Sequence, residues 1–326
     1  MLTRLRQSGQ KHLLAIFTTL LLAAQSPAFG FSLTGMLAHE AVYEAMRYGT
    51  HKAKYSEPIN APVAADMLVT QGRPNTACSQ FQSYGYPETS DAKILRRAFY
   101  TCRAGYAGMF DPAEKTPLWV AEHLTKDTVN GHANRKGMDF AEDPQIPHGA
   151  QGHRDDYKHS GFDMGHMAPA ADFRYSDGAM NQTFLLSNAV PQEPSHNRGI
   201  WANLEGAVRE MAARRGELYV ITGPIYAGSS QKIEQGRKVS SGEGVVIPTA
   251  LYKVIVDHAR KEMTAFIIPN NAQQGDDPAR FQVNVRDVER VTGLNFNPSL
   301  ARAEADRQEV GGGSWVIPKV RIKFND

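Results

Sequence analysis

The chain has 326 residues, of which 41% are hydrophobic and 21% are charged, with 36 Lys and Arg against 34 Asp and Glu. This composition is typical of a soluble protein with a sizeable core, and it excludes disordered, collagen-like and disulfide-scaffold classes. Because the formal net charge is only +2, any affinity for a polyanion must come from a local basic site and not from bulk charge.

The first thirty residues have the three-part pattern of a secretory signal peptide. Three basic residues and no acidic ones come first, and an apolar run over 13–24 follows. Small residues at 28–30 then form the cleavage region. The apolar run is shorter than the roughly 20 residues that span a membrane, and an uncleaved signal anchor is the alternative. We expect cleavage near Gly30, a periplasmic or secreted mature chain with a formal charge of −1, and no stable membrane association after cleavage.

The sequence contains two cysteines, Cys78 and Cys102. In an oxidising compartment they are expected to form a disulfide, which would contribute about 3 kcal/mol through the loop it closes. Two unpaired buried thiols are the alternative reading.

After the signal peptide, residues 31–91 form a poorly patterned lead-in with a short helical stretch around 39–46 and several prolines. No chemistry is assigned to this segment. The main domain is expected to cover 92–326, beginning near Ala92.

Several β-rich runs follow in the domain. The run 118–124 is expected to be a buried strand, and a polar stretch punctuated by Gly and Pro follows over 126–158. Further β-rich runs cover 183–188, 218–222, 252–256 and 263–268. Because regular helices do not separate them, the pattern predicts an α+β fold with a largely antiparallel central sheet flanked by helices.

One amphipathic helix is expected over 197–214. Its apolar residues Ile200, Leu204, Val208 and Met211 recur at helical spacing and predict a stripe that faces the core. On a neighbouring face, polar residues and a tryptophan recur every four positions, at Asn197, Trp201, Glu205 and Arg209. Spacing alone favours an ordinary solvated surface for this second face, with Trp201 as a packing residue.

Three neighbouring segments change that interpretation: Asp163–Pro169, Ser187–Gln192 and His196–Glu205. A His after a Gly at the end of an extended run is suited to a cleft, where a neutral imidazole can act as a general base near pH 7. About thirty residues later, an Asn at a helix start offers a hard oxygen ligand suited to a hydrated Mg²⁺ ion. Together they fit the hydrolysis of a phosphodiester.

With these segments, the sequence resembles the DNA/RNA non-specific endonucleases, the ββα-metal nucleases. The resemblance covers roughly 94–300. Further landmarks occur in the order typical of the family, at 117–124, 222–224, 247–253 and 291–294. A ββα-metal catalytic module within the α+β domain is therefore expected.

The resemblance implies roles for three residues of this module. His166 would deprotonate the attacking water, and Asn197 would be the single direct protein ligand of a hydrated Mg²⁺, with Mn²⁺ as an alternative ion. Glu205 would hold the waters of the metal, about two turns further along the same helix.

Four further positions are compared with the family pattern. Arg209 would lie near the phosphate, and Arg135, in the long polar stretch, would contact substrate. Asn188 would support the site; the alternative, equally favoured, is that it is a structural residue of a turn. Met164 stands where the family usually has an arginine, and a Met cannot supply a fork of donors to phosphate. We expect this difference to alter rate, substrate preference or metal dependence and not to abolish activity.

The activity implied is that of a secreted, Mg²⁺-dependent, sugar-non-specific endonuclease that cleaves DNA and RNA to 5′-phosphorylated oligonucleotides. The alternatives are a catalytically impaired relative that binds nucleic acid, and a phosphodiesterase for another substrate. An inhibitor protein and a second copy in a homodimer are further partners that the family suggests. A histidine- and aspartate-rich stretch fits no zinc template and is expected to be a solvated loop, comprising His153, Asp155, Asp156, His159 and His166.

Overall fold

The computed structural model describes residues 76–229, 231–240, 242–272, 275–311 and 315–320. The predicted signal peptide and the helical stretch near 39–46 lie outside these ranges. Within the ranges described, none of the helices combines the length and the apolar character that a membrane crossing requires.

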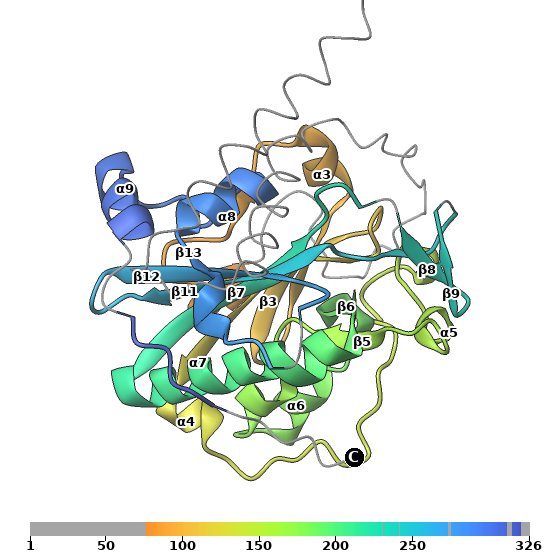
Figure 1. The fold of residues 1–326 in the computed structure, drawn as a ribbon, viewed down its shortest axis with the longest axis horizontal. Coiled ribbons are helices and arrows are strands. Elements are labelled where there is room, and N and C mark those ends of the chain that lie inside the picture. Colours follow the sequence, from red (N-terminus) through yellow and green to blue (C-terminus); the bar gives the residue numbers. More distant parts are fainter. Residues whose placement is uncertain (1–75, 230, 241, 273–274, 312–314, 321–326) are drawn as a thin grey trace, which may run out of the picture. The chain divides into compact units, whose positions relative to one another are not determined.

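An antiparallel sheet of seven strands forms the centre of the domain, in the order β13-β12-β11-β7-β4-β3-β2 (Figure 1). Its long central strands are rich in β-branched and aromatic residues, which favour extended backbone. The strands are β2 (Phe99–Cys102), β3 (Tyr106–Asp111), β4 (Thr116–Thr125), β7 (Glu217–Ile225), β11 (Ala250–Asp257), β12 (Glu262–Pro269) and β13 (Gln282–Val283). The predicted α+β fold with a largely antiparallel sheet is confirmed.

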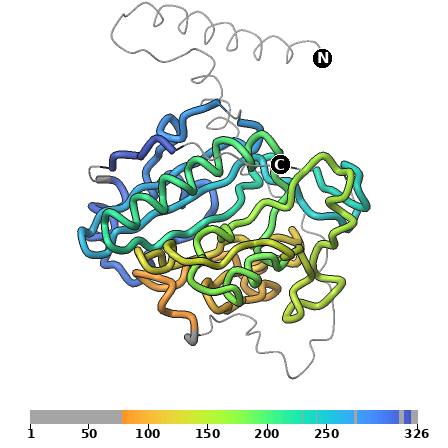
Figure 2. The backbone as a smooth tube through the Cα atoms, turned by 90° about the horizontal axis from the view of Figure 1, so that it is seen from below, coloured from red at the N-terminus to blue at the C-terminus, as the bar shows by residue number. Residues whose placement is uncertain are grey.

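Helices lie on both sides of this sheet. Figure 1 shows α4, α6 and α7 on one side, and α3, α8 and α9 on the other. From below, in Figure 2, the backbone of α7 runs beside the sheet strands. The helices are α3 (Ala92–Arg97), α4 (Lys126–Val129), α5 (Arg154–Tyr157), α6 (Asp177–Gln182), α7 (Ala202–Arg215), α8 (Val285–Thr292) and α9 (Arg302–Gly311).

The core between α7 and the sheet contains the predicted apolar stripe. Ile200, Leu204, Val208 and Met211 are all buried there, together with side chains of β4, β7, β11 and β12. Trp201 is buried in the same cluster, as expected for a packing residue. This packing fixes the position of α7 on the sheet.

Three smaller sheets complete the fold. β5 (Asp163–His166) pairs with β6 (Ala189–Gln192), and β1 (Glu88–Thr89) pairs with β14 (Leu294–Asn295). β8 (Lys232–Glu234) lies between β9 (Arg237–Val239) and β10 (Val245–Val246). Because β6 leads into α7 through a short connection, β5, β6 and α7 form a strand–strand–helix unit.

Two predicted elements differ in the structure. The run 183–188 is not a strand, because it contains a 3₁₀ turn, η5 (Leu186–Asn188), and the strand begins only at Ala189. The side chains of Thr183 and Asn188 hydrogen-bond backbone carbonyls within and near this turn, which competes with strand pairing. The other short turns are η2 (Thr76–Phe81), η3 (His148–Ala150), η4 (Ala170–Phe173) and η7 (Pro278–Phe281).

The predicted helix also begins differently. Residues His196–Trp201 form a π-helical turn, η6, and regular α-helix starts at Ala202. Gly199 has a non-helical backbone, with φ −116° and ψ −106°, which a residue without a Cβ adopts most easily. Such π-helical turns are often found at functional sites.

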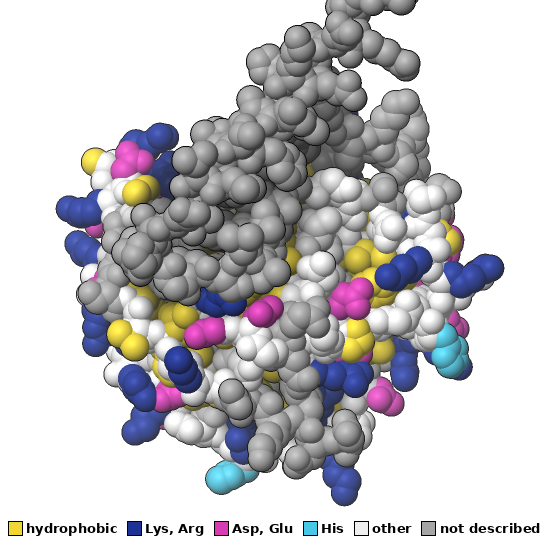
Figure 3. Space-filling model, in the orientation of Figure 1, with side chains coloured by type: hydrophobic (Ala, Val, Ile, Leu, Met, Phe, Trp, Pro, Cys, Tyr) yellow, Lys and Arg dark blue, Asp and Glu magenta, His cyan; other side chains and the backbone are white. Residues whose placement is uncertain are grey.

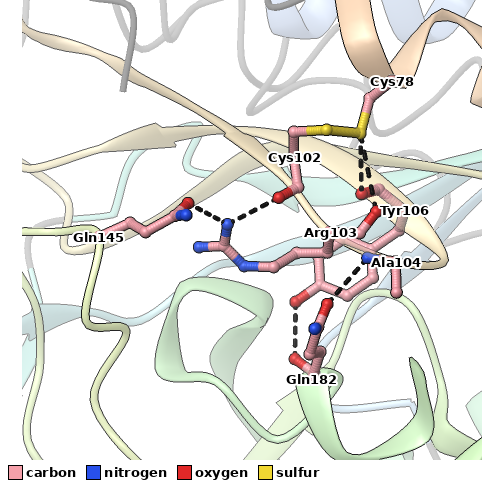
Figure 4. Close-up of a disulfide and its surroundings, with 7 residues drawn as sticks. All are labelled: Cys78, Cys102, Arg103, Ala104, Tyr106, Gln145 and Gln182. Carbon is pink, nitrogen blue, oxygen red and sulfur yellow. Dashed lines mark hydrogen bonds between the residues drawn. A yellow bond between two sulfur atoms is a disulfide. The ribbon is translucent and has the colours of Figure 1, made fainter. Parts of the chain in front are cut away.

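The predicted disulfide between Cys78 and Cys102 is confirmed, with 5.7 Å between the two Cα atoms. It joins η2 to the end of β2, and Figure 4 shows it beside Arg103 and Tyr106. Residues 76–91 are thus tied to β2 of the central sheet by a covalent bond and to β14 by strand pairing. The structured domain therefore begins before residue 92.

Candidate active site

The β5–β6 pair positions His166, the last residue of β5. Its Cα is paired with Ala189, and Asp163 at the other end of β5 is paired with Gln192. Gly165 lies so close to the Gln192 side chain that a Cβ at this position would be 1.9 Å from Oε1. Glycine is therefore required at position 165, because the Gln192 side chain occupies the space that a side chain there would need.

The imidazole of His166 packs against two aromatic rings that also contact each other. Its centroid lies 4.7 Å from that of Phe140 and 4.8 Å from that of Phe184. Nε2 is buried and has no hydrogen-bond partner among the described residues. Burial, followed by the positive charge of Arg135, lowers the pKa of His166 to about 3. The ring is therefore neutral at physiological pH and able to accept a proton.

Arg135 lies next to this histidine, in the polar stretch between β4 and β5. Its Cζ is 5.3 Å from the centroid of the Phe184 ring. The side chain is exposed, so its guanidinium remains accessible to a ligand from solvent. The structure brings Arg135 near enough to His166 for its charge to act on the imidazole.

Asn188 is fully buried and is used within the fold. Its Nδ2 donates to the carbonyls of Ala168 and Thr183, at 2.9 and 2.8 Å. Its Oδ1 accepts from the backbone N–H of Ala168 at 2.9 Å. Asn188 therefore holds the backbone two residues after His166.

Asn197 lies in the π-helical turn η6 and is oriented by β5. Its Nδ2 donates to Oδ2 of Asp163 at 2.8 Å. Arg198 also donates to both oxygens of Asp163, at 2.9 and 2.8 Å. The amide oxygen of Asn197 accepts no hydrogen bond from the described residues, and a carbonyl oxygen fixed in this way is a suitable ligand for Mg²⁺.

Glu205 and Arg209 belong to a charged cluster between α7 and the sheet. Arg209 donates to Oδ1 of buried Asp172 at 2.7 Å. Glu122 of β4 and Lys253 of β11 are 1% exposed, and Nζ of Lys253 donates to Thr222 at 2.6 Å. Burial raises the pKa of Glu205 to about 7, although the charges of Lys253 and Arg209 oppose this.

Met164 points into an apolar cluster. It packs, partly buried, against a set of buried residues from several elements, comprising Tyr157, Phe162, Leu186, Ala189, Ile233, Val245 and Ile247. The position that carries an arginine in the usual family pattern is thus an apolar contact here.

The predicted residues form two groups. His166 at the end of β5 lies near Arg135, Asn188 binds the backbone of Ala168 two residues further on, and Glu205 and Arg209 share the cluster under α7. Asn197 is connected to the first group through Asp163 of β5. In the described part of the chain, no hydrogen bond or ion pair joins His166 directly to Asn197 or Glu205.

Sequence reasoning missed the partners of these residues. Asp163 orients Asn197, Asp172 holds Arg209, and Glu122 and Lys253 lie beside Glu205. Asp163 was within the motif and begins the same strand as His166, which was the available signal. The other residues come from distant segments, and only the packing of α7 on the sheet brings them together.

Of the five residues that the sequence places in a solvated loop, Asp156 is buried and belongs to α5. Asp156 accepts from the backbone N–H groups of His153 and Gln235, at 2.9 and 3.0 Å, and so connects α5 to the turn between β8 and β9. His159 is exposed, and His166 lies in the aromatic contact described above. On the face in Figure 3, basic and acidic side chains of the described residues are interspersed and do not form one continuous basic surface.

Fold and motif together define a mixed α+β protein of the nuclease type. The sequence profile described as DNA/RNA non-specific endonuclease matches residues 79–303. The chain belongs to this family.

Relatives of known name support the assignment. The chain is 38% identical over 235 residues to "Nuclease EXOG, mitochondrial" of Danio rerio, covering 68% of this chain and 65% of that protein. It is 31% identical over 242 residues to "Endonuclease G, mitochondrial" of Homo sapiens, covering 72% and 79%. The match to human EXOG covers 61% of that protein. This chain therefore spans less than two thirds of the length of the two EXOG relatives named here.

A solved structure has the same fold. It is described as the EndoG/EndoGI complex and a mechanism of EndoG inhibition, and it aligns with a TM-score of 0.59 and 32% identity. The alignment covers 69% of this chain and 93% of the other. The α+β architecture is therefore that of EndoG.

Proposed function

We propose that the protein is a Mg²⁺-dependent, sugar-non-specific endonuclease that cleaves DNA and RNA to 5′-phosphorylated oligonucleotides. The observation that carries this proposal is the strand–strand–helix unit, in which β5 ends at His166 and its Asp163 orients Asn197. Family membership gives the class of substrate. The geometry supplies a proton acceptor and an oxygen ligand on adjacent elements.

His166 is the proposed general base. Because its pKa lies far below neutrality, almost all molecules hold the neutral imidazole, which takes the proton from an attacking water. The packing against Phe140 and Phe184 fixes the ring. A bound phosphate would offset the charge of Arg135 and make the imidazole a stronger base.

Asn197 and Glu205 are the proposed metal-binding residues. Asn197 offers a fixed carbonyl oxygen, and Glu205, with a pKa raised to about 7, offers a carboxyl group that can hold the waters of the metal once it is ionised. These donors fit a hard cation that keeps most of its waters. When bound, Mg²⁺ would stabilise negative charge on the phosphate and on the leaving oxygen.

Arg135 is the proposed phosphate contact on the side of His166, because its side chain is exposed and adjacent to that ring. Arg209 is partly neutralised by Asp172, and we propose that it keeps Glu205 correctly oriented as well as lying near the phosphate. Asn188 is proposed as a positioning residue. Met164 removes one cationic contact that the usual family pattern supplies.

The location and partners are further proposals. A signal-like N-terminus and the Cys78–Cys102 disulfide support a periplasmic or secreted enzyme, since disulfides persist in oxidising compartments. The similarity to EndoG in its complex with EndoGI supports an inhibitor protein as a partner. A homodimer remains a proposal from the family resemblance.

The test is digestion of plasmid DNA and of RNA by the purified protein, with and without EDTA. His166→Ala is expected to lower turnover by about 10² or more, while exposed His132→Ala serves as the matched control. Asn197→Ala should raise the magnesium concentration needed for half-maximal activity. Full activity in His166→Ala would remove the proposed base, and an unchanged magnesium titration would remove Asn197 as ligand.

Binding of nucleic acid without cleavage would favour the second candidate, a catalytically impaired relative. The observation behind this alternative is Met164, which is packed among apolar side chains and offers no donor. Circular dichroism of each variant separates loss of activity from loss of fold.

A further inference from the structure

Glu142, His148 and His153 form a cluster outside the proposed nuclease site. Nδ1 of His148 lies 2.5 Å from one carboxylate oxygen of Glu142, and Nδ1 of His153 lies 2.7 Å from the other. One potential ligand atom from each residue lies within 4.8 Å of the others. The nuclease family motifs do not include this set.

The backbone that carries the cluster is fixed by buried hydrogen bonds. The Gln151 side chain donates to the carbonyls of Asp143 and Ile146, at 3.0 and 2.8 Å, and accepts from the N–H of Asp143 at 2.7 Å. The carboxylate of Asp143 in turn binds Arg103 and Ser187. Residues 142–151 are therefore held in one arrangement by groups that are not themselves candidate ligands.

His153 is held independently of this loop. Its backbone N–H donates to Oδ2 of Asp156 at 2.9 Å, at the start of α5. Two of the three side chains are thus on separately anchored segments, Glu142 after Phe140 and His153 before α5. His148, 78% exposed at its side chain, is the one that can adjust.

The donor set indicates which class of ion would bind. Two imidazole nitrogens and one carboxylate suit a transition metal such as Zn²⁺, whereas Mg²⁺ prefers oxygen ligands. At bond lengths of about 2.0–2.1 Å, tetrahedral ligands lie about 3.3 Å apart. The observed spacing needs only a small movement of the exposed His148 ring, with the ion replacing the protons now shared with Glu142.

We propose that Glu142, His148 and His153 bind one divalent transition metal ion of the zinc class, with water completing the coordination. The bound ion would connect the loop after Phe140 to the start of α5. Because Phe140 contacts the His166 ring, this loop is adjacent to the proposed general base. The proposal does not depend on nuclease activity.

The experiment measures zinc binding by the purified protein without a histidine tag, in competition with a chromophoric zinc chelator. The variants are Glu142→Gln and His148→Ala, and the matched control is His132→Ala, another exposed histidine. We expect one equivalent of zinc in the wild type and the control. Affinity should fall at least about tenfold in each ligand variant, in line with the loss of a metal ligand.

Two further measurements complete the test. Zinc should raise the melting temperature of the wild type and the control but not of Glu142→Gln, because binding to the folded state stabilises it. The effect should persist in Asn197→Ala, which excludes binding at the proposed magnesium site. Absence of zinc binding by the wild type, or equal affinity in the ligand variants, would overturn the proposal.

Discussion

Replacing Gly165 by Ala tests whether the packing beside His166 is as the structure describes. An added Cβ would lie 1.9 Å from Oε1, 2.8 Å from Cδ and 2.7 Å from Cβ of Gln192. Gln192 is fully buried, and its Nε2 donates to Nδ1 of His196 at 2.6 Å. The glutamine cannot move aside without losing this hydrogen bond.

The expected cost has two parts. Overpacking a buried site costs about 1–3 kcal/mol, and the lost hydrogen bond adds about 0.5–1.5 kcal/mol. The sum is a loss of about 1.5–4.5 kcal/mol in the free energy of unfolding, or a fall in melting temperature of about 3–18 °C. Because Gly165 lies between Asp163 and His166 on β5, we also expect kcat to fall, since a displacement of about 1 Å can cost about 10²-fold.

The assay is thermal and urea unfolding of Gly165→Ala, with initial rates of plasmid cleavage measured at a temperature where the variant is folded. Gly178→Ala is the matched control. Gly178 is exposed at the start of α6 and a Cβ there would meet only Ser176 Oγ at 3.7 Å, so this change should stabilise the helix by up to about 1 kcal/mol. Unchanged stability and kcat in Gly165→Ala would refute the reasoning.

Three other predictions follow from the site and the disulfide. The magnesium concentration for half-maximal activity should fall as pH rises from 6 to 8, because Glu205, with a pKa of about 7, gains its charge in this range. Glu205→Gln should abolish this pH dependence. A dependence that persists in the variant would mean that another group causes it. Met164→Arg should raise kcat/KM for polymeric DNA by adding a phosphate contact, and no change would mean that another cation already serves this position. Reduction of the Cys78–Cys102 bond, which closes a loop with a sequence separation of 24, should destabilise the fold by about 3.5 kcal/mol, and an unchanged melting temperature in reductant would contradict this.

The sheet could be predicted because its strands are encoded locally. The runs 118–124, 218–222, 252–256 and 263–268 lie within β4, β7, β11 and β12. Their β-branched and aromatic residues favour extended backbone whatever their neighbours. The run 183–188 has a similar composition, but Thr183 and Asn188 use their side chains to bind nearby carbonyls, and this local chemistry produces a turn.

The site was predictable only in part, for a different reason. His166, Asn197 and Glu205 lie in motifs with recognisable order along the chain. Their surroundings depend on residues distant in sequence, such as Phe140 and Phe184, which both contact the imidazole and each other. Pattern and spacing do not encode which side chains meet when α7 packs on the sheet.

The charges beneath α7 explain how Glu205 could serve a cation. Three carboxyl groups, Glu122, Asp172 and Glu205, lie near two cations, Lys253 and Arg209. Burial, followed by the charge of Asp172, raises the pKa of Glu122 well above its ordinary range, although the charge of Lys253 opposes this.

A pKa of about 7 places Glu205 at the point where small changes in local charge decide its protonation. An approaching cation favours the ionised form, because a positive charge lowers the pKa of a nearby carboxyl group. The carboxylate is then available to accept hydrogen bonds from metal-bound waters, while Asp172 keeps Arg209 from neutralising it fully. The buried ion network therefore makes the charge of Glu205 conditional on the ion that it would help to hold.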